Sequence, residues 1–335
     1  MAFLRSFIIT LAIMAPSFKL LANAAVTPRS NKCSVWYDVL KDIQNEVFDG
    51  SKCGEEAHES IRLAFHDAIS YSPRLGGGGA DGSIMMYPEI ETKYAENAGL
   101  DDIVHRQRPF ALKHGVSFGD IIQFANAVAL SNCEGGPRVP FYAGRSNYSQ
   151  PSPDNLVPAP FHSVDQILGR MSEVGFDSDE VVALLAAHSV AAQDQQDTSM
   201  KGSPLDSTPS VFDGQFYLET MTNSPPEGVF RIPADRLFAT DPRTVCLWQT
   251  FVDDHNSMVN QFSRAMVKLA AVGQDHASLY DCSEAIPAPR RLRNHRPKFP
   301  YGQSAKHVHY KCTEASFPQA KLNHDSSPVP PVQKS

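Results

Sequence analysis

The sequence predicts a mainly α-helical protein, and three stretches carry this prediction. Residues 55–69 contain neither glycine nor proline and mix apolar with polar residues, as an amphipathic helix does. Residues 34–48 place apolar side chains at helical spacing. Residues 116–130 are strongly apolar and begin near Ser117, a favourable helix N-cap. The chain of 335 residues is long enough for one large or two medium domains with a sizeable core.

The second half of the chain predicts further helices. One covers residues 163–174, and the next follows the capping residues 178–180 and contains the apolar run VVALLAAHSVA. Residues 244–272 predict one or two amphipathic helices. Proline and glycine dominate residues 135–160, which predicts the boundary between two halves in this stretch. Proline is frequent again from residue 285 onward, so we expect an extended segment that wraps the surface.

One face of the helix at residues 55–69 combines groups with distinct chemistry. Four residues fall within roughly 60° of one another around the helix: Glu55, Glu59, Arg62 and His66. A neutral histidine accepts and returns a proton, and an arginine stabilises developing negative charge, so the pair suits cleavage of a peroxide O–O bond. The two glutamates suit a divalent cation. The structural alternative is an ordinary arginine–glutamate helix pair beside a core histidine.

A second histidine, His188, ends an apolar run in the second half of the chain. We therefore expect a buried imidazole at this position. The structural alternative is a core histidine that bonds to the backbone, and this alternative is favoured when the residue is considered alone. The functional reading is an axial ligand to a buried metal or haem.

An oxygen-rich loop follows each of the two histidines. After His66, the candidate oxygen donors are Asp67, the carbonyl of Gly79, Asp81 and Ser83. After His188, residues 206–213 crowd several carboxylates and hydroxyls into one short loop. Both sets suit Ca²⁺, which prefers many oxygen ligands. The glycines at 76–79 do not indicate a nucleotide site, because the loop lacks the G-K-[ST] ending of a phosphate-binding loop.

Residues 1–24 have the features of a secretory signal peptide. Arg5 precedes an apolar run, and residues 22–24 form the small-residue cleavage pattern Ala-Asn-Ala. The formal net charge of −7 makes the chain a poor binder of nucleic acid or of an anionic membrane. No later apolar run reaches the roughly 18 residues that a membrane span needs. We therefore expect a secreted, extracellular protein with neither a nucleic-acid nor a membrane partner.

Six cysteines in a secreted chain predict three disulfides, although their spacing alone permits many connectivities. The absence of a C-x-x-C pair disfavours a structural zinc site. Residues 147–149 form the glycosylation sequon Asn-Tyr-Ser, which is consistent with secretion.

Three motifs together resemble one known family. They are RLAFHDA at residues 62–68, GGGGADGS at residues 76–83 and AHSVA at residues 187–191. The sequence is similar to the secreted fungal class II haem peroxidases, within the plant-type peroxidase superfamily, from about Cys33 to Pro287. The resemblance implies a plant-type haem peroxidase fold in which two helical halves clasp one haem b. It places the distal half at about 33–155, the proximal half at about 156–287 and an extended tail at about 288–335.

The resemblance also implies roles for residues around the haem. His66 would be the distal acid–base group, Arg62 the distal cation and Phe65 a side chain packed over the haem. Asn97, tied to Glu91, would fix the tautomer of His66. On the other side, His188 would be the axial iron ligand and Asp235 would orient its ring.

Two calcium sites and a disulfide pattern follow from the same resemblance. The distal Ca²⁺ ligands would be Asp67, Gly79, Asp81 and Ser83. The proximal Ca²⁺ ligands would be Ser189, Asp206, Thr208, Val211 and Asp213. The disulfides would be Cys33–Cys282, Cys53–Cys133 and Cys246–Cys312. The family usually has a further bridge that starts next to Cys33, where this chain has Ser34, so we expect one bridge fewer.

Manganese-oxidising members of the family carry three carboxylates beside a haem propionate. Here the matching positions hold Glu55, Glu59 and Asp194. Ala183 stands where lignin-type and versatile members carry an exposed tryptophan. The resemblance therefore implies a short-type manganese peroxidase, most simply a monomer. It would use H₂O₂ to oxidise Mn²⁺ to Mn³⁺, which would leave with a small dicarboxylate chelator and attack lignin-like phenolic compounds.

The sequence leaves two alternative functions open. One is a generic, low-potential peroxidase that oxidises small phenols directly at the haem edge. The other, from a different class, is a secreted protein that binds calcium and haem without turnover. Leu205 stands where the family commonly has a phenylalanine beside the axial histidine, which bears on the haem potential but not on the core catalytic set.

Overall fold

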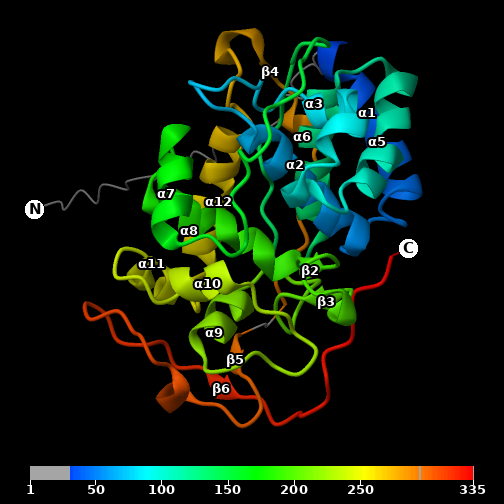
Figure 1. Ribbon diagram of the computed structural model, residues 1–335. Helices are drawn as coiled ribbons and strands as arrows, with labels where there is room; N and C mark the ends of the chain where they lie inside the picture. Colours follow the sequence, from blue (N-terminus) through cyan, green and yellow to red (C-terminus); the bar gives the residue numbers. More distant parts are fainter. Residues whose placement is uncertain (1–30, 294–295, 335) are drawn as a thin grey trace, which may run out of the picture.

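The computed structural model describes residues 31–293 and 296–334, and the predicted signal peptide at 1–24 lies outside these ranges. The prediction of a mainly α-helical fold is confirmed (Figure 1). The α-helices of the described residues are α1 Val35–Glu46, α2 Glu55–Ile69, α3 Ser83–Met86, α4 Pro88–Glu91, α5 Asp101–His114, α6 Phe118–Asn132, α7 Val164–Glu173, α8 Ser178–Leu184, α9 Gln215–Met221, α10 Pro233–Phe238, α11 Val245–Thr250 and α12 His255–Leu269.

Short elements fill the connections between these helices. The 3₁₀-helices of the described chain are η1 Asn31–Cys33, η2 Ala95–Asn97, η3 Leu185–Val190, η4 Thr198–Met200, η5 His276–Ser278, η6 Ser283–Ala285 and η7 Ala305–His307. The strands are β1 Tyr142–Ala143, β2 Ala192–Gln193, β3 Ser203–Pro204, β4 Tyr280–Asp281, β5 Lys298–Phe299 and β6 Lys321–Leu322. β1 pairs with β4 and β2 with β3 in antiparallel fashion, whereas β5 and β6 are parallel. None of the described helices is both long and apolar enough to cross a membrane.

Helix α2 is the central element of the first half. It packs mainly against α6, and also against α5, so nearly all of its residues are buried. Beside them, the rings of Trp36, Phe124 and Phe141 lie 4.7–5.0 Å apart and close the core between α1 and α6. Burial on several sides holds α2 in a fixed position. A rigid α2 is what positions Arg62 and His66.

The second half of the chain packs around α8, α9 and α12. Helix α12 lies against α8 (Figure 1). Helix α9 lies against the 3₁₀-helix η3, which carries His188. Behind η3, Tyr217 and Trp248 form an edge-to-face pair with ring centroids 4.8 Å apart. Both side chains are fully buried. The aromatic cluster therefore supports η3 from the side away from α2.

The three disulfides that the resemblance implies are confirmed. Cys53–Cys133 ties the start of α2 to the end of α6. Cys33–Cys282 joins the beginning of the described chain to the segment after α12, across 249 residues. Cys246–Cys312 fastens the C-terminal segment to α11. No free cysteine is left among the described residues.

Several predicted boundaries shift in the structure. The N-cap of α8 is Asp177, whose carboxylate accepts from the Glu180 amide, one residue before the predicted capping stretch. The predicted helix through VVALLAAHSVA changes to 3₁₀ geometry at Leu185. Residues 244–272 form two helices, α11 and α12, within the range predicted. The helices that were not predicted are α3, α4, α5, α9 and α10, of which α5 is the longest.

Candidate active site

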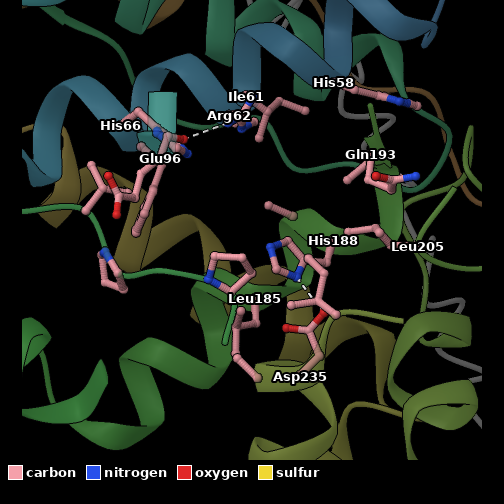
Figure 2. A pocket seen from close by; sticks show the side chains of 18 of the residues that line it. His58, Ile61, Arg62, His66, Glu96, Leu185, His188, Gln193, Leu205 and Asp235 are labelled. Carbon is pink, nitrogen blue, oxygen red and sulfur yellow. Dashed lines mark hydrogen bonds and ion pairs between the residues drawn. The ribbon is translucent and has the colours of Figure 1, made fainter. Parts of the chain in front are cut away.

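A cavity separates α2 from η3, and the predicted catalytic side chains face it from both sides (Figure 2). Arg62 and His66 point into it from α2, and His188 points into it from η3. Apolar side chains form much of the remaining wall: Phe65, Val157, Leu184, Val190, Leu205 and Phe238. The fold therefore brings together two chain segments more than one hundred residues apart in sequence.

A chain of hydrogen bonds fixes the ring of His66. The Nδ1 atom of His66 lies 2.8 Å from Oδ1 of Asn97, and Nδ2 of Asn97 donates to the Glu91 carbonyl at 2.9 Å. The Asn97 side-chain nitrogen donates to that carbonyl, so the Asn97 side-chain oxygen is the atom that faces His66 and accepts from its Nδ1–H. This assignment leaves the lone pair of Nε2 facing the cavity. The side chain of Glu91 takes no part here; it accepts instead from the Ser152 amide at 3.1 Å.

The environment keeps His66 neutral. Burial and the positive charge of Arg62, opposed by the hydrogen bond to Asn97, together lower the pKa of His66 to about 3. A neutral ring with a free Nε2 is a proton acceptor at any pH above that value. It is the form that general-base chemistry requires.

Arg62 is held by backbone carbonyls rather than by a carboxylate. Its guanidinium donates to the carbonyls of Ala98 at 3.1 Å and Glu96 at 2.8 Å (Figure 2). Burial lowers the pKa of Arg62, while nearby Glu59 raises it. An arginine stays charged under such conditions. Its charge therefore remains available to a developing anion in the cavity.

His188 is oriented by a buried carboxylate. Its Nδ1 donates to Oδ2 of Asp235 at 3.0 Å (Figure 2), and Asp235 is only 2% exposed. The ring of Phe216 meets His188 edge-on at 5.5 Å. With Nδ1 engaged, Nε2 faces the cavity. The expectation of a buried imidazole is wrong in detail, because the His188 side chain is 28% exposed and lines the cavity.

These residues fit the haem that the resemblance implies. An apolar slot lies between two histidines, and one of them presents Nε2 with a carboxylate on its other nitrogen, as an axial ligand requires. Phe65 lines the same cavity next to His66, with ring centroids 5.9 Å apart. The opposite histidine would stand on the free side of the macrocycle. The donor set thus matches an iron porphyrin rather than a small-metal site.

Three carboxylates border the cavity at one edge: Glu55, Glu59 and Asp194. Glu55 and Glu59 are 5% and 8% exposed, and each has one buried carboxylate oxygen without a hydrogen-bond partner in the described chain. Burial raises the pKa of Glu55 to about 7, with Glu59 and Asp194 adding to the effect. Burial likewise raises the pKa of Glu59 to about 7. Such a pair is destabilised as two anions and stabilised by a bound cation.

Lysines that the sequence reasoning did not single out stand beside these carboxylates. Lys334 Nζ lies 3.3 Å from Oε1 of Glu59, and Lys201 Nζ lies 3.8 Å from Oδ2 of Asp194. The other oxygen of Asp194 accepts from the Gly202 amide at 2.9 Å. Within residues 31–293 and 296–334, no three His, Cys, Asp or Glu side chains gather closely enough to hold a metal ion. The sequence carries no local signal for the contact of Lys334, because 275 residues separate it from Glu59.

The predicted distal calcium residues lie at the end of α2, in the loop that follows it and at the start of α3. Asp67 is fully buried; its Oδ2 accepts from the Gly82 amide at 3.0 Å, and its Oδ1 has no partner among the described residues. Asp81 accepts from the Ser83 amide at 3.0 Å. Burial raises the pKa of Asp67 strongly and that of Asp81 to about 6. The Gly79 carbonyl accepts from the Asp81 amide at 2.7 Å, so it lies beside this carboxylate, and oxygen donors of these kinds suit Ca²⁺.

The predicted proximal calcium residues cluster in the same way. Thr208 donates through its hydroxyl to Asp206 at 3.3 Å and to Asp213 at 3.2 Å. Asp206 is fully buried, and its Oδ2 lacks a partner in the described part of the chain. Burial raises the pKa of Asp206 well above its usual value, with Glu219 adding to the effect. Ser189 is buried in η3, directly after His188, and the Val211 amide donates to the Thr208 carbonyl.

Comparison with known proteins agrees with this geometry. A family model described as Peroxidase matches residues 39–254, and one described as Fungal peroxidase extension region matches residues 257–333. The chain is 46% identical over 310 residues to Ligninase B of Phanerodontia chrysosporium, covering 85% of this chain and 83% of that protein. It is 44% identical over 333 residues to Versatile peroxidase VPS1 of Pleurotus eryngii, covering 92% and 90%.

Proposed function

The chain belongs to the fungal class II haem peroxidases, and from this premise we propose that it is a secreted manganese peroxidase. It would use H₂O₂ to convert Mn²⁺ into Mn³⁺, which leaves with a small dicarboxylate chelator and attacks lignin-like phenolic compounds. Two Ca²⁺ ions, at the distal and proximal loops, would stabilise the cavity. The resident haem would be held by His188 Nε2, with Asp235 orienting the ring.

The two residues on α2 would manage the protons of the peroxide. When bound, haem supplies the two-electron reduction of H₂O₂ and is restored by single electrons from the reductant. The Nε2 atom of His66 accepts a proton from one peroxide oxygen and returns it to the departing oxygen. The Arg62 guanidinium stabilises the negative charge that develops as the O–O bond lengthens. Asn97 keeps the His66 proton on Nδ1, so that Nε2 is free to act.

Manganese as the reductant rests on one observation. Glu55 and Glu59 are buried at the rim of the cavity beside Asp194, and each carries a carboxylate oxygen with no partner in the described chain. Hard anionic oxygens suit Mn²⁺ and favour Mn³⁺ more strongly, because its charge is higher. Overall, H₂O₂, two Mn²⁺ and two protons would give two waters and two Mn³⁺.

A second candidate is direct oxidation of small phenols at the haem edge. The observation in its favour is that the carboxylates, as they stand, do not close around a metal position. Oxidation of large substrates through an exposed surface tryptophan is disfavoured for this chain, because Ala183, only 1% exposed, stands where lignin-type and versatile members carry that tryptophan.

The test compares Asp194→Ala with Asp197→Ala in the haem-loaded enzyme. Asp197 lies in the same loop, but its side chain caps η4 and does not line the cavity. Peroxide-dependent Mn³⁺ formation in malonate buffer should show a KM for Mn²⁺ roughly 10- to 100-fold higher in Asp194→Ala only. Oxidation of a small phenol should persist in both variants. If wild type shows no saturation with Mn²⁺ yet oxidises the phenol, the manganese assignment is wrong.

A further inference from the structure

The C-terminal segment is docked onto the loop that carries Asp194. Two backbone hydrogen bonds hold it: the Val329 amide donates to the Glu227 carbonyl, and the Val332 amide donates to the Gly202 carbonyl, both at 2.8 Å. In Figure 1 this segment, drawn in red, runs past β6 toward β2 and β3. The docking is therefore an ordered contact between the end of the described chain and the second half.

Two glycines make room for the docked segment. A Cβ atom at Gly228 would lie 2.2 Å from the Val329 carbonyl oxygen, and one at Gly202 would lie 2.9 Å from that of Val332. Both glycines have positive φ, +87° and +79° respectively. Any other residue at Gly228 would collide with the backbone of the tail. The two glycines therefore form a groove on the body of the protein that fits the backbone of the tail.

The docked tail delivers one ammonium group to the carboxylate site. Lys334 Nζ lies 3.3 Å from Oε1 of Glu59 and 3.1 Å from Oδ2 of Asp102, in the first turn of α5. The Lys334 side chain is 39% exposed, whereas that of Glu59 is only 10% exposed. The ion pair therefore stands on the solvent side of a buried carboxylate. A cation arriving from solvent would meet the ammonium first.

The same tail is also connected to Asp194. The Gly202 carbonyl accepts from the tail, and the Gly202 amide donates to Asp194 Oδ1 at 2.9 Å. One peptide segment therefore links the tail to a second carboxylate of the site. The tail contacts the site at both Glu59 and, through Gly202, Asp194.

We propose that Lys334 is an affinity-determining residue of the manganese site, a tethered cation that Mn²⁺ must displace from Glu59. This inference rests on the proposed function. Lys334 contacts Oε1 of Glu59, and Oε2 has no partner among the described residues. An ammonium and Mn²⁺ on the two oxygens of one carboxylate would lie at close range and repel each other strongly. The tether keeps the ammonium at a high effective concentration, so it competes at every Mn²⁺ concentration. Removing it should tighten Mn²⁺ binding.

The first experiment measures binding of Mn²⁺ alone to the resting full-length enzyme by titration calorimetry. Lys334→Gln should lower the apparent Kd roughly two- to fivefold, as expected for loss of one partly exposed ion pair. The matched control is Lys268→Gln. Lys268 pairs with Glu180 on another part of the surface, and its side chain is 40% exposed. Because both variants remove one positive charge, a general electrostatic effect would appear in both.

The second experiment follows the ammonium itself in wild type. Saturating Mn²⁺ should increase the rate at which an amine-acylating reagent modifies Lys334 severalfold and leave Lys268 unchanged, as read by mass spectrometry. Binding linkage requires this reciprocity if the two cations exclude each other. An unchanged Lys334 rate, or equal Kd values in all three proteins, overturns the inference and leaves the manganese assignment standing. If none of the proteins binds Mn²⁺, both the inference and the assignment fall.

Discussion

At the scale of single residues, the chemistry depends on which nitrogen of His66 carries the proton. Asn97 settles this, because its amide oxygen accepts from Nδ1 while its nitrogen donates to the Glu91 carbonyl. Asn97 does not line the cavity, so it acts only through His66. In the proposed mechanism, His66 would transfer the proton and Asn97 would orient its ring.

Asn97→Ala should therefore slow the reaction with H₂O₂ roughly 10- to 100-fold, because the His66 ring loses its fixed tautomer and orientation. Stopped-flow absorbance of the haem after mixing with H₂O₂ gives this rate directly. Asn132→Ala is the control: it also removes a buried amide, but one that pairs with Gln44 far from the cavity. Equal rates in the two variants would show that Asn97 only supports the fold.

Sequence reasoning succeeds at this scale where spacing on one helix decides the geometry. Arg62 and His66 lie one turn apart, so their convergence follows from helical periodicity alone. The pairing of His188 with Asp235 does not follow from periodicity, since 47 residues separate them. Only the family resemblance placed Asp235 in the site.

At the scale of elements, local patterns predicted the helices that bury one face, but not α5. Helix α5 is polar and contains Pro109, which reads as a helix breaker in sequence. Its burial against α1 and α6 compensates for that weakness, and such tertiary packing is invisible to a local pattern. The omission matters, because α5 supplies Asp102 to the contact with Lys334.

The stability of the two oxygen-rich loops also depends on more than their local sequence, because it depends on what balances their buried charges. Asp67 and Asp206 are both fully buried, and each has one unpartnered oxygen among the described residues. A buried carboxylate without a compensating charge destabilises the folded state. Each loop follows a segment that carries a histidine of the cavity. We therefore expect bound Ca²⁺ to stabilise α2 and η3 together.

Chelation of Ca²⁺ should lower the melting temperature, because a ligand that binds only the folded state stabilises it by about 2.7 kcal/mol at a hundredfold excess over its Kd. Differential scanning calorimetry with EGTA, then with added Ca²⁺ or Mg²⁺, measures the loss and its recovery. Ca²⁺ should restore stability and Mg²⁺ should not, since Mg²⁺ demands a tighter octahedral site. A melting temperature indifferent to EGTA would contradict calcium at these loops.

At the scale of the whole molecule, the fold class and the disulfide framework were within reach of the sequence, while the path of the tail was not. A proline-rich segment after Cys312 predicts an extended chain but no destination. The destination is set by Gly202 and Gly228, which the sequence shows only as two glycines among twenty. Long-range docking of this kind depends on surfaces that exist only after the fold has formed.

Gly228→Ala tests the tail as a unit. The added Cβ would lie 2.2 Å from the Val329 carbonyl oxygen, so the tail must leave its groove and take Lys334 with it. We expect the apparent Kd for Mn²⁺ to fall by the same roughly two- to fivefold as in Lys334→Gln. Gly302→Ala is the control, because Gly302 has a similar φ of +73° but no atom within 4 Å of an added Cβ. It therefore carries the same backbone strain without displacing the tail.

Titration calorimetry with Mn²⁺ on both variants separates two models of the tail. If Gly228→Ala tightens binding and Gly302→Ala does not, the tail and its ammonium act together, and docking strength tunes the affinity of the site. If Lys334→Gln tightens binding while Gly228→Ala matches wild type, the ammonium reaches Glu59 without a docked backbone. In that case the ammonium would be held near Glu59 only by the 22 residues from 313 to 334, which are anchored to α11 through the Cys246–Cys312 disulfide. The contacts at the two glycines would not be needed.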